Sequence, residues 1–426
     1  MKVHKQEISN YLVTFIFVML SFGYVISSFM PVYFNLPSRP FNVSFRALYL
    51  GISLYLILKG YKKITQRGMP RLFWAFLIFL ILYSIRIMYD SLVLGIVFKS
   101  SLFFLFSFSF GGTFIPFVAI AMYSKELNYK NVISASYFIL AISSLLILVL
   151  IFKLYGSINI SFLSSRFSFL SDDGKAETIN AITLSMYGML LSNMSIYFLL
   201  FRKSCRLIIV GSTLILGLLL LLLGASRGPQ ITFALGLLFQ LSVYVFVYKK
   251  SLVTKARFGI AVAGLFVFLS FLISKIDLES ITMYNRFANF GKDASSDTSL
   301  REASWIRAWD DFLNNPFLGR SYMDLYNMSY THNVYLESLM AMGMVGLFFF
   351  IFPYLTMAIK KITNVDQVFI YLLFVLTSFT AFFSGSLFIN PYLWSTLGLM
   401  IGFNSIRSRR LNSKKVGGDF NRYQKT

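Results

Sequence analysis

Residues 207–224 read LIIVGSTLILGLLLLLLG and contain no charged side chain. A helix rises 1.5 Å per residue, so about 20 apolar residues cross the hydrocarbon core of a bilayer. The uninterrupted run from Leu214 to Leu223 differs from the short alternating segments of an outer-membrane barrel. This stretch therefore predicts a membrane-spanning helix.

Apolar stretches of spanning length recur along the whole 426-residue chain. The first, residues 11–30, is longer than the apolar region of a signal peptide and has no small-residue cleavage site after it, so we interpret it as a retained helix. Gly111, Gly112 and Pro116 predict a kink or break in the fourth. The twelve expected spans are residues 11–30, 43–58, 72–89, 101–122, 132–152, 179–201, 207–224, 229–248, 258–274, 334–359, 367–384 and 391–406.

The composition agrees with a membrane protein. Apolar residues make up 57% of the chain and charged residues 13%, against about 25% charged residues in soluble globular proteins. An ordinary soluble enzyme, a disordered protein and a disulfide scaffold are thereby excluded. The expected fold class is an all-α polytopic membrane protein with about 12 transmembrane helices and a large, partly helical outer loop between helices 9 and 10.

The formal charge is +22, from 39 Lys and Arg against 17 Asp and Glu, which in a soluble protein would suggest nucleic acid. We sort it by the positive-inside rule with the N-terminus in the cytoplasm; the inner segments then hold 25 of the basic and 4 of the acidic residues. The inner face carries about +21 and the outer face about +1, so the charge orients the helices. We therefore expect both termini in the cytoplasm, the lipid bilayer as a partner, and no nucleic acid.

We expect one integral membrane domain over residues 1–426, with outer loops at 153–178 and 275–333 and a basic inner tail at 407–426. Because long connections in compact proteins are uncommon and tend to be functional, the two outer loops are the first places to search for a site.

Cysteine and histidine are too few for a disulfide or a usual zinc site, since the chain has only Cys205, His4 and His332. The pair Asp172-Asp173 is the one candidate for magnesium, and we interpret it as a solvated loop pair. We predict no metal and no cofactor.

The larger outer loop contains a predicted amphipathic helix. Ser299 and Glu302 have capping-box spacing, which places the helix start there. Arg307 and Asp311 are four residues apart and can pair on its surface. Arg301 then falls in the first turn, where the helix dipole disfavours a cation; a bound anion would explain it, and a solvated charge is the alternative.

Two further outer positions are candidate site residues. His332 lies where the loop becomes a membrane helix, and the positive helix end would favour a neutral imidazole that can accept a proton. A hydrogen-bonded interface histidine is the alternative. Glu337, five residues later, faces either the bundle or the interface.

Arg227 lies on the tight turn that joins two spans, in the segment Ala225-Ser226-Arg227-Gly228-Pro229. Ser226 suits a helix cap and Pro229 a first helical position. The free N–H groups of a helix start favour anions, and a guanidinium can bind a diphosphate with two N–H groups. A snorkelling interfacial arginine is the alternative.

Taken together, these segments resemble the O-antigen polymerase and O-antigen ligase family over residues 207 to 350 and, by topology, over the whole chain. The motifs in order are Ser226-Arg227-Gly228, Arg301 to Trp305, Asn315-Pro316-Phe317-Leu318-Gly319, His332 to Glu337, and Gly343-Met344-Val345-Gly346. The resemblance implies a metal-independent, inverting glycosyltransferase in the bacterial inner membrane. It would join polyprenyl-diphosphate-linked oligosaccharide donor and acceptor at the periplasmic face, in lipopolysaccharide O-antigen synthesis.

The resemblance also assigns roles to residues. Arg227 and Arg301 match arginines that face the lipid diphosphate, and Arg286 matches a third more weakly. His332 matches the proposed catalytic base, with Asn333 and Glu337 in its motif as supporting residues. The separation of Arg301 and His332 is shorter than in typical ligases, which favours a polymerase.

Three functions remain open: a polymerase with a chain-length regulator as a possible partner, a ligase that transfers glycan to lipid A core, and a flippase or transporter of lipid-linked sugars. A transporter predicts charged residues within the spans, and Arg86 is the clear case in the sequence. Tyr322, Tyr326 and Tyr330 in the outer loop could stack on sugars or pack at the interface.

Overall fold

A computed structural model describes residues 2–67, 69–97, 101–156, 169–170, 177–202, 207–248, 297–358, 362 and 364–402. Over these residues the chain is helical, apart from loops and one antiparallel pair, β1 (Phe169–Leu170) and β2 (Glu177–Ile179), in the smaller outer loop. The helices are α1 (Lys2–Phe22), α2 (Tyr24–Phe34), α3 (Ser38–Arg67), α4 (Arg71–Leu92), α5 (Leu102–Phe106), η2 (Ser107–Phe114), α6 (Ile115–Tyr123), η3 (Ser124–Glu126), α7 (Tyr129–Tyr155), α8 (Ala181–Phe201), α9 (Leu207–Gly224), α10 (Arg227–Val243), η5 (Tyr244–Tyr248), α13 (Asp297–Asn314), α14 (Val334–Gly346), η7 (Leu347–Ile351), α15 (Phe352–Ala358), α16 (Val365–Phe383), η8 (Leu387–Ile389) and a last helix over 391–402.

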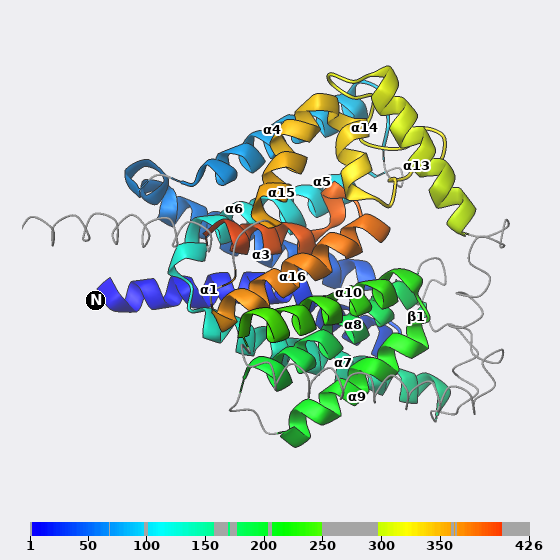
Figure 1. Ribbon diagram of the computed structural model, residues 1–426. Coiled ribbons are helices and arrows are strands. Elements are labelled where there is room, and N and C mark those ends of the chain that lie inside the picture. Colours follow the sequence, from blue (N-terminus) through cyan, green and yellow to red (C-terminus); the bar gives the residue numbers. More distant parts are fainter. Residues whose placement is uncertain are drawn as a thin grey trace, which may run out of the picture.

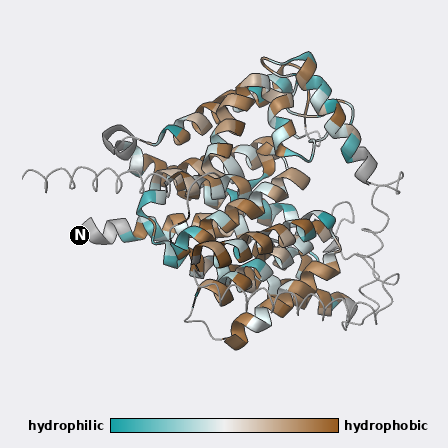
Figure 2. Ribbon diagram, in the orientation of Figure 1, coloured by the Kyte–Doolittle hydropathy of each residue, from teal (hydrophilic) through white to brown (hydrophobic). Residues whose placement is uncertain are grey.

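The helices form a bundle (Figure 1), and hydrophobic residues predominate along most of them (Figure 2). Nine described helical stretches are long and apolar enough to cross a membrane, or ten if the bent pair at the N-terminus is one span. These ten coincide with ten of the twelve predicted spans. Span 258–274 lies outside the described residues and span 391–406 is described only to residue 402, so the count of twelve stays a prediction.

The first span differs from the predicted continuous helix over 11–30, because it bends by 57° between α1 and α2, at Gly23. Side chains of other helices donate hydrogen bonds to the backbone carbonyl at the break. The hydroxyls of Ser143 and Tyr187 both donate to the Phe22 carbonyl at 2.9 Å. A break within a membrane is tolerated where neighbouring helices supply such bonds, and these partners lie more than a hundred residues away in sequence.

The fourth span departs from α geometry where the glycines predicted it. α5, η2 and α6 form one apolar stretch, Leu102–Glu126, and η2 is a π-helical segment that contains Gly111 and Gly112. Pro116 follows at the start of α6, where its missing N–H costs little. The wider π turn therefore absorbs the kink.

α8 is the most buried of the candidate spans, and it packs closely on α9. A Cβ on Gly188 would lie 2.3 Å from the Leu221 nitrogen, and one on Gly217 would lie 2.5 Å from the Ser192 hydroxyl. Small residues at these positions let the two backbones approach, as is usual for helices in membranes.

Segments that were predicted on the inner side meet at one end of the bundle. Arg202, after α8, forms an ion pair of 2.6 Å with Asp366 at the start of α16. Lys59 in α3 donates to Ser9 in α1 at 3.0 Å. The loops at the opposite end contain the candidate site. Which end faces the cytoplasm stays a prediction.

Candidate functional site

Arg227 is the first residue of α10, and Ser226 is the N-cap residue, as the turn chemistry predicted, although its side chain makes no capping bond. Pro229 is the third helical residue rather than the first. A Cβ on Gly228 would lie 3.2 Å from the Phe383 Cβ. The start of α10 therefore lies directly against the last residue of α16, and Gly228 permits this contact.

Arg301 borders the same residue of α16 from a different element. Its Nη1 donates to the Phe383 carbonyl at 3.5 Å, at the negative C-terminal end of that helix. The predicted position of Arg301 in a first turn is wrong, because α13 begins at Asp297 and Arg301 opens the second turn. The dipole argument for an anion at Arg301 thus falls, and a helix end is its present partner.

His332 adopts a left-handed backbone conformation, with φ of 58°. A non-glycine residue in that region costs of order 1–3 kcal/mol, and such strain concentrates at functional sites. The surrounding bonds hold it there. The Thr331 hydroxyl donates to the Asn333 carbonyl at 3.0 Å, and Trp305 in α13 donates through Nε1 to the Thr331 carbonyl at 2.9 Å.

The next residue, Asn333, caps α14, and its Oδ1 accepts bonds from two backbone N–H groups of the first turn, at 3.1 and 3.2 Å. Its supporting role is therefore to start the helix directly after His332. His332 and Asn333 therefore lie at a capped helix start, with His332 immediately before the cap residue.

Tyr330 and Trp305 lie between the His332 turn and the residues around Arg301. The rings of Tyr330 and His332 lie 4.3 Å apart, and Trp305 packs on Phe382, beside the partner of Arg301. Burial raises the pKa of the Tyr330 phenol, while the positive charge of Arg301 opposes the rise. Arg301 is thus close enough to act electrostatically on Tyr330, whose ring contacts His332 at a tilt of 54°.

Glu337 faces the bundle and is fully buried. Its Oε1 accepts three bonds, from the Tyr83 hydroxyl at 2.6 Å, the Ser386 hydroxyl at 2.8 Å and the Leu387 N–H at 3.1 Å. Its Oε2 has no hydrogen-bond partner among the described residues. Glu337 therefore joins α14, α4 and the segment after α16, and the alternative of an interface position is excluded.

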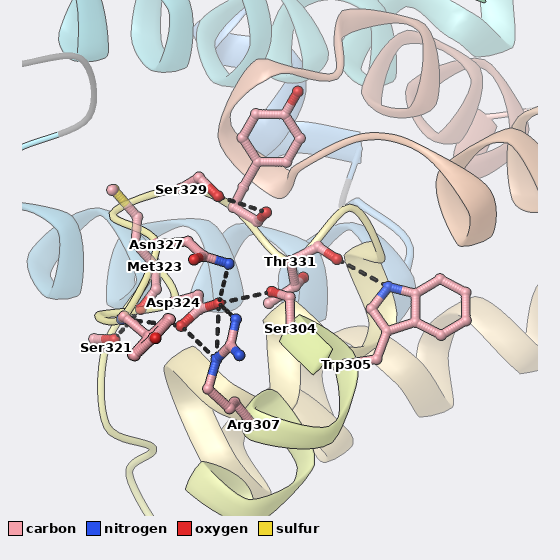
Figure 3. Close-up of polar contacts among 11 residues, drawn as sticks. Ser304, Trp305, Arg307, Ser321, Met323, Asp324, Asn327, Ser329 and Thr331 are labelled. Atoms are coloured by element: carbon pink, nitrogen blue, oxygen red, sulfur yellow. Dashed lines mark hydrogen bonds and ion pairs between the residues drawn. The ribbon is translucent and has the colours of Figure 1, made fainter. Parts of the chain in front are cut away.

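The outer loop after α13 is fastened by Asp324, as Figure 3 shows. Its carboxylate accepts from Arg307 through Nη2 at 2.6 Å and Nε at 3.1 and 3.2 Å, and from the Ser304 hydroxyl at 2.9 Å. The predicted pair of Arg307 with Asp311 is wrong; Asp311 pairs with Arg320. A bidentate bond to a buried carboxylate is stronger than an exposed ion pair along one helix. Arg307 and Asp311 therefore each pair with a residue of the loop rather than with each other.

Two motifs of the family resemblance pack against each other. The Met344 N–H donates to the Pro316 carbonyl at 2.7 Å, and a Cβ on Gly343 would lie 2.4 Å from that same oxygen. Gly343 has φ of 55° and kinks α14 at this contact. Gly343 and Pro316 therefore let α14 pack closely against the loop that follows α13.

The three outer-loop tyrosines have different environments. Tyr322 is fully buried; its N–H donates to Asp90 and its hydroxyl to the Ile96 carbonyl, both at 2.9 Å, so it holds the loop on α4. Tyr326 is 81% exposed, and Tyr330 is half-buried beside the imidazole. Only the last two have surface to offer a sugar.

Sequence analysis did not predict that side chains of α4 bond the outer loop and Glu337. Asp90 is buried and pairs with Arg86 at 3.0 Å, and Tyr83 on the same helix bonds Glu337. The four-residue spacing of Arg86 and Asp90 in an apolar helix was the available signal. Arg286 lies outside the described residues, as does the pair Asp172-Asp173.

The helix start that carries Arg227 and the side chain of Arg301 therefore both border the end of α16, and Trp305 links that end to Thr331, the residue before His332. In a comparison with known protein families, residues 212–351 match the family model described as O-antigen ligase. No curated protein and no solved structure matches the chain. The matched residues contain Arg227, Arg301 and His332 and all five motifs of the predicted resemblance. Over residues 212–351 the resemblance to the O-antigen polymerase and ligase family is thus confirmed.

Proposed function

We propose that the protein is an O-antigen polymerase, a metal-independent and inverting glycosyltransferase that joins polyprenyl-diphosphate-linked repeat units at the periplasmic face of the bacterial inner membrane. One observation carries the proposal: the start of α10 with Arg227 and the side chain of Arg301 both border Phe383, and Trp305 links the same corner to the turn of His332. A cationic pair beside an imidazole suits a reaction that releases a diphosphate.

The arginines would stabilise the leaving group. Negative charge grows on the lipid diphosphate as the glycosidic C–O bond breaks, and fixed cations aimed at that charge lower the barrier. Arg301 is available for this task because its bond to Phe383 is 3.5 Å long, near the limit for a hydrogen bond, and a guanidinium has five N–H donors. An incoming diphosphate would displace that weak contact.

His332 would act as the general base. The acceptor hydroxyl attacks the anomeric carbon as its proton passes to the imidazole, and the diphosphate leaves from the opposite face, so the configuration inverts. The bonds of Thr331 and Asn333 fix the strained backbone turn that carries His332 before substrate arrives. This mechanism needs no pair of carboxylates of the kind that glycosidases use.

A deletion strain, followed by gel analysis of its surface polysaccharide, tests the function. Loss of a polymerase leaves lipid A core that carries a single repeat unit. Loss of a ligase leaves bare core and accumulated lipid-linked polymer, and this second candidate is favoured by the description of the matching family model. Loss of a transporter would instead leave bare core, with lipid-linked single repeat units retained on the inner leaflet.

Variants returned to the deletion strain test the site. We expect His332→Ala and Arg227→Ala to abolish polymer while the protein reaches the membrane in normal amounts. Asp310→Ala is the matched control, because its exposed side chain lies on α13 in the same loop. Wild-type banding from either site variant would remove that residue from the mechanism. A reporter fused near Asp311 that reads cytoplasmic would overturn the topology.

A further inference from the structure

Arg46 lies inside a membrane-spanning helix. It belongs to the stretch Ser38–Tyr61 of α3, and its side chain is half-buried. Its guanidinium carbon lies 3.2 Å from the centroid of the Phe108 ring in η2. Arg39, seven residues earlier and so on the same face of α3, lies 6.0 Å from the ring of Phe103 in α5. Two arginines of α3 thus face one aromatic segment.

The charge of Arg46 has no acidic partner in the described part of the chain. Stacking on Phe108 occupies a face of the guanidinium, whereas its N–H groups point along the edges. No described residue accepts a hydrogen bond from Arg46 or forms an ion pair with it. The neighbouring segments 24–61 and 101–123 contain no Asp or Glu at all.

An arginine in this position requires compensation. A guanidinium does not lose its proton in a protein, so it cannot become neutral to enter the bilayer. Cation–π stacking recovers only part of the cost of removing the charge from water. Arg86 in α4 shows the usual solution, since it pairs with Asp90 four residues away. Arg46 lacks such a carboxylate among the described residues, which leaves an external anion.

The Arg46 surroundings connect to the candidate site. Gly112 in the π-helical segment lies beside the arginine, with an added Cβ 3.8 Å from its Cδ, and π turns are frequent at functional sites. Thr113 in the same segment donates to the Phe388 carbonyl at 3.3 Å. Phe388 lies five residues after Phe383, so the segment that borders Arg301 also touches the wall of the Arg46 site.

We propose that Arg46, assisted by Arg39, binds the diphosphate of a second polyprenyl lipid, the acceptor that is extended by the donor held at Arg227 and Arg301. The inference rests on the proposed function, because a polymerase must hold two lipid diphosphates at once. A fork of N–H donors suits a diphosphate, and its place within a span suits an anion that arrives attached to a lipid.

Binding of polyprenyl diphosphate to the full-length protein, counted by native mass spectrometry from nanodiscs of neutral lipid, tests the proposal. We expect two bound molecules for the wild type, and one for Arg46→Gln with affinity at the lost site lowered about tenfold or more. Lys59→Gln is the matched control, because Lys59 lies in the same helix and bonds Ser9 at the other end. It should still bind two.

Further arms separate the possible results. Arg301→Gln should lose the other molecule, and two molecules on that variant would count against the proposed function but not against the Arg46 site. Two molecules on Arg46→Gln would overturn the inference and leave the function standing. Displacement by equimolar phosphatidylglycerol would show a bulk-lipid contact and also overturn it. If Arg46→Gln does not fold, Arg46→Lys decides: its point charge should bind the diphosphate more weakly at an unchanged melting temperature, and wild-type affinity would refute the site.

Discussion

The bond between Arg307 and Asp324 should hold the outer loop closed, and breaking it should open the loop by a predictable amount. The Asp324 side chain is 3% exposed and Arg307 31%, with three N–O contacts of 3.2 Å or less between them. Charge-assisted hydrogen bonds contribute roughly 1.5–3 kcal/mol. Because Arg307 is nearly one-third exposed and partly screened, we expect a pair coupling of about 2 kcal/mol.

Hydrogen–deuterium exchange of the loop amides measures this coupling directly. The Tyr326 N–H donates to Asp324 at 3.1 Å, so it reports opening of the loop. Asp324→Asn should speed its exchange about thirtyfold, the factor that corresponds to about 2 kcal/mol. A double-mutant cycle with Arg307→Gln isolates the pair from the other bonds of Asp324. A coupling below about 0.5 kcal/mol would refute the reasoning, since the pair would then be no stronger than an exposed one.

The same cluster predicts a pH dependence. Burial alone would raise the pKa of the Asp324 carboxyl, but the hydrogen bonds from Arg307, Ser304 and the Tyr326 N–H outweigh it and lower the pKa below the ordinary 3.8. A lowered pKa in the closed loop means that the stabilisation is fully present above the ordinary value and is lost as the pH falls through the lowered one. Loop protection should therefore be constant from pH 7 to 5 and fall in stronger acid. Asp324→Asn should remove that acid dependence, and an unchanged profile would contradict this assignment.

Three further predictions concern the site and its frame. Arg301→Lys should lower polymer synthesis in membranes at normal protein levels, because an ammonium does not replace the guanidinium fork; full activity would remove the need for the fork. Gly228→Val should place a side chain 3.2 Å or less from Phe383, and the overpacking should cost about 1–3 kcal/mol and lower the melting temperature. A thermal scan would detect this. Gly211→Val is the control, because nothing lies within 4 Å of a Cβ at that glycine. Glu337→Gln should keep the three hydrogen bonds at one side-chain oxygen and therefore normal protein levels. Glu337→Ala leaves three buried donors without an acceptor, at a cost of roughly 1–3 kcal/mol each, and should lower the protein level. Immunoblots of membranes measure both variants, and equal levels would argue against a structural role for these bonds.

Local sequence determined the spanning helices. A run such as 207–224 must be helical in a bilayer, because every backbone group has to be paired within the segment and the span length is set by the hydrocarbon thickness. Turn and cap chemistry likewise predicted the helix starts beside Arg227 and His332, whereas the predicted start beside Arg301 was displaced by one turn. The apolar pattern also predicted that a helix starts at residue 334, directly after the His332 segment.

Pairings between distant segments were decided only by tertiary structure. Arg307 bonds Asp324 in the loop rather than Asp311 on its own helix, because the buried carboxylate offers two oxygens and less water. The break at Gly23 depends on hydroxyls from α7 and α8, which no local pattern contains.

The contacts of Arg301 and of the start of α10 with the end of α16, and the three bonds to the buried Glu337, also come from packing. Sequence could place each group at the outer end of some helix. Which helix ends lie together depends on how small residues and aromatic rings let the helices pack, and that choice is made by the whole bundle at once.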